Sequence, residues 1–457
     1  MSNAIVFMSD EHNPRFSSPY GHDFLETPNM QRLADEGTLF KNAYCPSPLC
    51  VPSRSAFLSG KRVHGIRAYG NTRHYIPPET NGIGARMDEQ GIHTVLVGKV
   101  HAYRPAEELG FSETLVPHDG AYFFDMAQQR QPLAVRKGAG KRFDKYGPRE
   151  APWGKDADRM EAAIDWLKNR APTIDQPWVM YLNLTRPHFP HFCDDVLWDK
   201  YKDHGDLPEH GIEAETAQHP FMVDVRQHFE LENVPEEHVR GLRRGYYACV
   251  SYIDEQLGRI LSALESLDLI DTTNLLYTSD HGEMLGKFGL WWKCNLLEDA
   301  ARIPCIAMGP DFSPNKQIET SVDLHDVQAS VFSVTGATHP ETWLGTPLET
   351  LTTEDAKKVV FSEYHGHGTR AGSFMVRKAN WKLIHNIGAP HQLFDLGSDP
   401  EELNNLFDTT QEKARELSKD LLEICDPEVE NQKAEEFWQM QVSRFERGDE
   451  SQIRGLR

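Results

Sequence analysis

The chain has 457 residues, of which 39% are hydrophobic and 26% are charged. This composition is typical of a soluble globular protein, and the length allows one large and one small domain. The formal net charge of −21 argues against partners that present phosphate-rich surfaces, so we expect neither nucleic acid nor an anionic membrane surface as a partner.

The sequence also bears on the cellular compartment. No apolar run approaches the length of a membrane span, and nothing in the first 30 residues resembles a signal peptide. The seven cysteines are odd in number and lack paired metal-ligand spacing. We therefore expect a cytoplasmic protein without structural disulfides.

The first predicted strand ends in two acids. Residues 5–8 form a short apolar run typical of a buried parallel strand, and Asp10 and Glu11 follow it directly. Open α/β sheets bind ligands at this end of their strands, although two acids after a strand could also simply begin a turn. A helix is predicted next, from Thr27-Pro28 to Gly37.

The stretch 45–60 predicts a helix with a cysteine at its N-terminus. Pro52 suits the first helical residue and Gly60 suits the end. Cys50 would then face free N–H groups, and Arg54 lies one turn further along, so the spot favours an anion and an activated nucleophile. The alternative is a buried cysteine beside a surface arginine.

A Gly-rich loop at 65–71, which contains Asn71, a helix at 80–90 and a strand at 94–97 follow. In an extended stretch after this strand, Lys99 and His101 would point to the same side. Such a pair usually lies on the surface unless an anion binds there.

Two irregular stretches flank the next regular elements. Residues 104–155 show no clear period and are interpreted as an excursion over the sheet. A helix at 155–170 and a strand at 178–184 come next, and His188 follows that strand. Residues 192–235 are acidic and rich in histidine, which indicates either a flexible rim of the site or a merely solvated segment.

The second half of the large domain repeats the pattern of strand, polar residues and helix. A long helix is predicted at 235–267, and the strand at 274–278 leads to Asp280 and His281. Lys293 lies twelve positions after His281, and a strand at 304–308 and a helix at 323–335 follow. The alternation predicts an α/β fold whose large, mainly parallel sheet is sandwiched by helices.

Beyond residue 350 the pattern changes to short strands in hairpin order, at 359–364, 373–377, 382–387 and 392–394. A helix at 411–424 and a charged tail complete the chain. We therefore predict a catalytic domain over 1–350 and a smaller C-terminal α+β domain with its tail over 351–457.

The polar residues at strand ends indicate a metal site. Asp10 and Asp280 each follow a strand, and Glu11 and His281 stand beside them. Carboxylate oxygens suit a hard divalent cation such as Ca²⁺, whereas the histidine leaves Mn²⁺ possible.

Cys50-Val51-Pro52-Ser53-Arg54 resembles the signature of the type I sulfatases of the alkaline phosphatase superfamily. Further support comes from Gly98-Lys99-Val100-His101, Pro187-His188, and Ser279-Asp280-His281-Gly282-Glu283 with Lys293. The resemblance covers nearly the whole chain and is greatest to the cytoplasmic branch similar to choline sulfatases and phosphonate monoester hydrolases. It implies an alkaline phosphatase-like fold and hydrolysis of a small-molecule sulfate ester.

The resemblance also implies roles for individual residues. Cys50 would be oxidised to formylglycine by a formylglycine-generating enzyme, and its hydrate would be the nucleophile. One divalent metal would be held by Asp10, Glu11, modified Cys50, Asp280 and His281. The sulfate and its leaving oxygen would be held by Arg54, Lys99, Lys293 and His188, with His101 as a base and Asn71 as a further contact.

Two alternatives remain open at this stage. The same site could hydrolyse phosphate diesters or phosphonate monoesters, although the Lys99 and His101 pair, which phosphonate monoester hydrolases lack, favours sulfate. The second alternative is that the chain is a non-catalytic relative of the family that only binds anions. The alcohol of the substrate is not specified, and a homo-oligomer is possible.

Catalytic groups at strand ends can contact only the sulfate, so selectivity has to come from the pocket walls. We expect these walls from 104–155, from 192–235 and from the loop 364–368, at the domain junction. His365 and His367 in that loop could equally be solvent-exposed turn residues.

Overall fold

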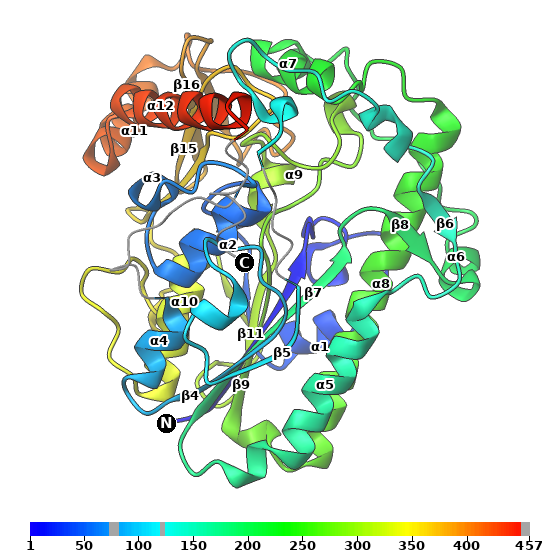
Figure 1. The fold of residues 1–457 in the computed structure, drawn as a ribbon, viewed down its shortest axis with the longest axis vertical. Helices are drawn as coiled ribbons and strands as arrows, with labels where there is room; N and C mark the ends of the chain where they lie inside the picture. The colour runs from blue at the N-terminus through cyan, green and yellow to red at the C-terminus, as the bar shows by residue number, and fades with distance from the viewer. Residues whose placement is uncertain (73–81, 119–123, 449–457) are drawn as a thin grey trace.

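An eight-stranded sheet forms the centre of this computed structural model, which describes residues 1–72, 82–118 and 124–448 (Figure 1). In spatial order the strands are β12 (Lys316–Ile318), β2 (Thr38–Phe40), β11 (Cys305–Met308), β9 (Thr273–Ser279), β1 (Asn3–Asp10), β7 (Trp178–Pro187), β4 (His93–Lys99) and β5 (Glu113–His118). Neighbours from β9 to β5 pair in parallel, whereas β11 is antiparallel to both β9 and β2. The predicted mainly parallel sheet is confirmed.

Helices cover both faces of this sheet, because strands buried on two sides carry apolar residues on both. Along β1, Ile5 and Phe7 enter one core with α1 (Pro28–Asp35), α5 (Lys155–Asn169) and α8 (Glu236–Ser266). Val6 and Met8 point to the other face and enter the core with α2 (Cys50–Ser59), α4 (Ile83–Asp88) and α10 (Leu324–Thr335). Figure 1 shows these two helix layers on either side of the sheet.

The C-terminal part forms a second sheet, as expected. It is an antiparallel meander of β14 (Val359–Tyr364), β15 (Ser373–Lys378), β16 (Trp381–Asn386) and β17 (Gln392–Asp395). Helix α11 (Gln411–Ile424) covers one face, where Leu417 and Leu421 pack against Phe374 and Leu393.

The expected charged tail is instead largely a helix, α12 (Pro427–Glu446). Asp426 caps its first turn, and Ala434, Phe437 and Trp438 recur at helical spacing and are buried. These residues pack against Tyr69 in the large domain. The predicted charged tail is therefore helical up to Glu446, because an apolar stripe lies between its charges.

Two further expectations are corrected. Residues 104–155 contain β5, which extends the main sheet at its edge, and β6 (Tyr146–Pro148), which pairs with β8 (His191–Cys193). Residues 192–235 contain α6 (Asp195–Lys200) and α7 (Pro220–His228). Phe221 and Val225 of α7 are buried in the core, so this segment is not merely solvated.

The remaining elements are short. They are β3 (Ala43–Tyr44), β10 (Arg302–Ile303), β13 (Val322–Asp323), α3 (Val63–Ile66) and α9 (Glu298–Ala301). The first two residues of the helix predicted at 80–90 lie outside the described residues. The first two residues of the Gly-rich loop predicted at 65–71 belong to α3. Within the described residues, no helix has both the length and the apolarity needed to cross a membrane. All seven cysteines are free.

Candidate active site

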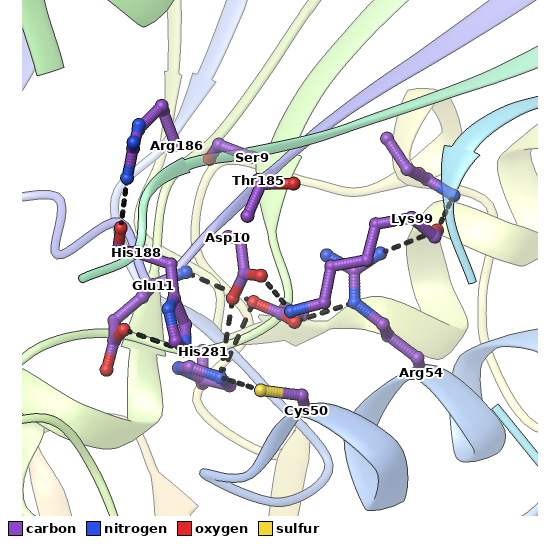
Figure 2. A network of polar contacts seen from close by, with 12 residues as sticks. Ser9, Asp10, Glu11, Cys50, Arg54, Lys99, Thr185, Arg186, His188 and His281 are labelled. Atoms are coloured by element: carbon purple, nitrogen blue, oxygen red, sulfur yellow. Dashed lines mark hydrogen bonds and ion pairs between the residues drawn. The ribbon is translucent and has the colours of Figure 1, made fainter. Parts of the chain in front are cut away.

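The site begins where two neighbouring strands end. β1 and β9 pair in parallel with Ser9 beside Ser279, so the next residues, Asp10 and Asp280, leave the sheet side by side. Both carboxylates are fully buried. The Nε2 atom of His281 lies 3.8 Å from Asp10 Oδ1 and 3.7 Å from Asp280 Oδ1 (Figure 2).

Cys50 approaches this group from the start of helix α2. The helix begins at Cys50 and ends at Gly60, whose φ of 64° is the left-handed conformation that favours glycine. The Sγ atom of Cys50 lies 3.2 Å from His281 Nε2. Four residues each place one potential ligand atom within 4.8 Å of the others: Asp10, Cys50, Asp280 and His281.

The imidazole of His281 is oriented as a metal ligand would be. Its Nδ1–H donates to the carbonyl of Gly282 at 3.0 Å, because a carbonyl can only accept, and this leaves the lone pair of Nε2 facing the group. Burial lowers the pKa of His281 to about 3, so the ring is neutral at physiological pH.

Two cations face the carboxylates. Arg54 Nε donates to Asp280 Oδ2 at 2.7 Å, and Lys99 Nζ contacts Asp10 Oδ2. Burial alone would raise the pKa of Asp280, but the Arg54 guanidinium and, to a smaller extent, the charge of Lys99 hold it well below its usual range. Burial lowers the pKa of Lys99 to about 7.

Unpaired polar atoms in this cluster fit both a cation and an anion. Asp10 Oδ1 and Arg54 Nη2 are buried and have no hydrogen-bond partner among the described residues. A buried acceptor and a buried donor left unpaired each cost about 1–3 kcal/mol, so such atoms indicate bound groups. The donor set of two carboxylates and one imidazole suits a divalent metal, and the guanidinium suits an oxyanion.

The thiol of Cys50 is not activated as the sequence suggested. Burial, together with the charges of Asp280 and Glu11, raises its pKa to about 12 despite nearby Lys293 and Arg54. The position at a helix N-terminus favours a thiolate, but at this depth desolvation is the larger effect. The unmodified side chain is therefore a protonated thiol at neutral pH.

Glu11 is not part of the group around His281. Its backbone has a φ of 67°, and its carboxylate faces Lys293, whose Nζ lies 3.0 Å from Oε1. Lys293 Nζ also donates to His188 Nε2 at 2.9 Å, since Nδ1–H of His188 donates to the carbonyl of Phe189 at 2.7 Å. Burial and the charge of Lys293 lower the pKa of His188 well below its usual value.

Of the remaining predicted residues, Asn71 lies beside the first turn of α2, and His101 lies near Lys99 and Arg54. Asn71 Oδ1 accepts from the backbone N–H of Val51 at 3.0 Å, which fixes the first turn of α2. His101 is buried, and burial together with the charges of Lys99 and Arg54 lowers its pKa well below the usual value. All the residues predicted from the sequence are therefore gathered in one region of the molecule.

Several of these side chains are held on strained backbone. Besides Glu11, His101 has a φ of 40°, and Trp292 and Cys294 on either side of Lys293 have φ values of 64° and 80°. Non-glycine residues in this region cost about 1–3 kcal/mol each and cluster at functional sites. Such conformations had no signal in the sequence.

A pocket opens above Cys50, and all three predicted stretches contribute to its walls. Arg136 and Arg142 come from 104–155, Phe229 from 192–235 and His367 from the loop 364–368. Both histidines of that loop are buried, so the alternative of exposed turn residues is wrong. His365 does not line the pocket, because its Nε2 contacts Glu363 at 2.8 Å.

Sequence reasoning did not identify the charged and aromatic side chains of this pocket. Arg136 and Arg142 lie in an irregular segment, where no period predicts which side chains converge. Two of the aromatic lining residues could have been suspected from the sequence, because each is adjacent to a predicted site residue. Trp292 precedes Lys293, and Phe189 follows His188.

Comparison with known proteins now adds to this geometry. The family model described as Sulfatase matches residues 2–337, and the model described as N-sulphoglucosamine sulphohydrolase, C-terminal, matches residues 286–426. A choline-sulfatase from Rhizobium meliloti (strain 1021) is 31% identical over 434 residues, which cover 88% of this chain and 82% of that protein. Arylsulfatase K from Canis lupus familiaris is 28% identical over 450 residues, covering 92% and 82% respectively.

Solved structures share the fold. BT4656, determined in complex with its substrate D-glucosamine-2-N,6-O-disulfate, gives a TM-score of 0.74 at 21% identity and covers 93% of this chain and 97% of its own. The phosphonate monoester hydrolase SpPMH from Silicibacter pomeroyi gives 0.74 at 22% identity, covering 93% and 95%. Both likenesses support the alkaline phosphatase-like fold predicted from the sequence.

Proposed function

Because the chain belongs to the sulfatase family, we propose that it hydrolyses a small-molecule sulfate ester with a formylglycine made from Cys50 as the nucleophile. The observation that carries this proposal is the placement of Cys50 Sγ, 3.2 Å from His281 Nε2, at the start of the helix of Cys50-Val51-Pro52-Ser53-Arg54. A buried thiol with a pKa of about 12 is a poor nucleophile at neutral pH, so the proposed reaction requires the converted side chain.

In this proposal Asp10, Asp280, His281 and the side chain at position 50 hold one divalent metal. A metal bound there would supply Lewis-acid polarisation and lower the pKa of a bound hydroxyl. Carboxylate oxygens favour Ca²⁺, and Mn²⁺ is the alternative because of the imidazole. Glu11 contributes its charge next to Lys293.

The cations hold the sulfate. Arg54 contacts the carboxylate of Asp280 and Lys99 that of Asp10, while Lys293 is buried beside Glu11, whose charge keeps Lys293 protonated. Burial alone would lower the pKa of Lys293, but the charge of Glu11 and its hydrogen bond to Lys293 keep it above its usual value. Charge-assisted hydrogen bonds to a developing oxyanion are the largest stabilising effect available to such a site.

Two residues are assigned to proton transfer, Lys293 as the donor to the leaving oxygen and His101 as the acceptor. Lys293 uses two of its three N–H bonds on Glu11 and His188, and the third is available to the leaving oxygen of the ester. His188 keeps Lys293 in position, because its Nε2 accepts from Lys293 and cannot donate. His101 is assigned as the base for the side chain at position 50: its lowered pKa leaves it neutral and able to accept a proton, but makes it a weak base.

We also propose the division into a catalytic domain at 1–350 and a smaller domain at 351–457. The four-stranded sheet with α11 has a core of its own, which supports the division. Trp438 of the smaller part donates its indole N–H to the carbonyl of His365 at 2.8 Å and so supports the loop that carries His367.

An ester panel tests the proposed function. Purified protein is assayed with 4-nitrophenyl sulfate, bis(4-nitrophenyl) phosphate and a phenylphosphonate monoester, and the metal is identified by elemental analysis. Sulfate ester hydrolysis should give the highest kcat/KM. A higher kcat/KM for the phosphonate monoester would favour the alternative, phosphonate monoester hydrolysis at the same residues.

A further inference from the structure

The pocket above Cys50 carries more positive charge than a sulfate group requires. Besides Lys293, its walls include the guanidinium groups of Arg136 and Arg142. Among the described lining residues the single carboxylate is Asp125, whose side chain is half exposed. This local charge is opposite in sign to the chain's net charge of −21.

Arg142 lies on an aromatic surface. Its guanidinium is 4.8 Å from the ring centre of Phe189, 5.0 Å from Trp292 and 5.9 Å from Phe229. The rings contact one another, with centres 5.4 Å apart for Phe189 and Trp292 and 5.1 Å apart for Phe229 and Trp292. Stacking on several rings restricts the plane of the guanidinium, so its position in the pocket is defined before any ligand binds.

Arg136 supplies the second guanidinium. Its backbone N–H donates to the carbonyl of His228 at 2.8 Å, and its Nη1 lies 3.6 Å from Asp125 Oδ2, which is longer than a hydrogen bond. His367, which lines the same pocket, is neutral and adds no further positive charge. Burial, with the charges of His228, Arg136, Arg142 and Lys293, lowers its pKa well below the usual value.

This arrangement decides between two kinds of alcohol. A quaternary ammonium group binds on open aromatic faces, but here a guanidinium already occupies the faces of Phe189 and Trp292 and would repel a second cation. A carboxylate or a sulfate would instead accept paired hydrogen bonds from the arginines. A bound anion also offsets part of the desolvation cost of these half-buried guanidinium groups.

We propose that Arg136 and Arg142 form a subsite for a second anionic group, a carboxylate or a second sulfate, on the alcohol part of the substrate. The proposal rests on the proposed function, because it places the sulfate that is cleaved at Cys50 and the second anion at Arg136 and Arg142, which line the same pocket. Substrate class thereby narrows from sulfate esters in general to esters of anionic alcohols.

The test compares matched esters. The wild-type enzyme is assayed with a methyl hexoside monosulfate, the corresponding methyl hexuronoside monosulfate, a methyl hexoside disulfate and choline sulfate. We expect kcat/KM to be about tenfold or more higher for an ester with a second anion than for the neutral hexoside, and lowest for choline sulfate. The hexuronoside and the disulfate distinguish a carboxylate from a second sulfate.

Variants show whether the arginines are responsible. Arg142→Gln should reduce kcat/KM for the anionic ester about tenfold more than for the neutral one, mainly through KM, and Arg142→Lys should restore part of the loss. Arg149→Gln is the matched control, because Arg149 also stacks on a ring, 4.9 Å from the centre of Phe192, but lies outside the pocket. If Arg142→Gln does not fold, Arg136→Gln gives the same comparison.

Two results would overturn the inference while leaving the proposed function intact. One is a wild-type enzyme that hydrolyses choline sulfate or the neutral hexoside as efficiently as the anionic esters. The other is an Arg142→Gln variant that loses the same factor on every ester. Failure of the proposed function looks different, since no sulfate ester would then be hydrolysed by protein carrying the modified Cys50.

Discussion

Replacing Lys293 with alanine tests the assignment of roles in the site. The ammonium group of Lys293 is buried between Glu11 Oε1 at 3.0 Å and His188 Nε2 at 2.9 Å, on the pocket side of Cys50. Removing one such stabiliser of developing charge costs about 10²–10³ in kcat, or about 2.7–4 kcal/mol. Metal should be retained, because Lys293 is not among the four residues of the metal cluster.

The size of the loss should depend on the leaving group. If Lys293 donates to the leaving oxygen, an activated 4-nitrophenyl ester needs the proton less than an alkyl ester does, and its kcat should fall less. The assay is kcat for both esters together with metal content per chain. An equal loss for both esters, or loss of the metal, would refute the assigned role.

Lys287→Ala is the matched control for Lys293→Ala. Lys287 is also buried, but between two acids, at 2.8 Å from Asp299 Oδ2 and 2.7 Å from Glu401 Oε2, and it does not line the pocket. This variant should lower the free energy of unfolding without changing the ratio between the two esters.

Three further predictions concern metal binding, backbone strain and acid stability. Asp280→Asn should abolish turnover and reduce the metal content measured by elemental analysis, and full metal content would contradict its role. Gly98→Ala should destabilise the fold by about 1–3 kcal/mol in urea unfolding, because Gly98 has a φ of 91° and a Cβ would overlap the carbonyl of Asn183. Burial lowers the pKa of His191 to about 3 and of His228 to about 4. Both are below the ordinary value, so at these two residues the unfolded chain binds more protons as pH falls from about 6.5 to 4, and they should contribute a fall in stability of roughly 2–3 kcal/mol per pH unit there. An unfolding midpoint that rises on acidification would contradict this.

The parts of the fold with strong periodicity could be predicted from the sequence. Buried strands such as β1 and β9 are short apolar runs, and the polar residues that follow them, Asp10 and Asp280, necessarily meet because the strands are parallel neighbours. The edge strand β5 could not be predicted in this way, because its residues are only partly buried and show no alternation. Helix α12 could have been found from Asp426-Pro427 and the spacing of Ala434 and Trp438.

The pocket walls could not be predicted in detail. Their side chains converge from irregular segments, where position depends on tertiary packing and not on sequence period. Arg142 is an example, since it is defined by rings at positions 189, 229 and 292 that are far from it in sequence. The positive φ values at Glu11 and on either side of Lys293 change the direction in which these side chains point, and no local sequence pattern indicates such φ values.

The most direct test of the central claim is the mass of the peptide that contains Cys50, measured on the same preparation as sulfatase activity. Conversion of cysteine to formylglycine lowers the peptide mass by about 18 Da. Preparations made with and without a formylglycine-generating enzyme should show activity in proportion to the converted fraction, and protein carrying only the thiol should be inactive. Full sulfate ester hydrolysis by protein whose Cys50 is entirely a thiol would contradict the account.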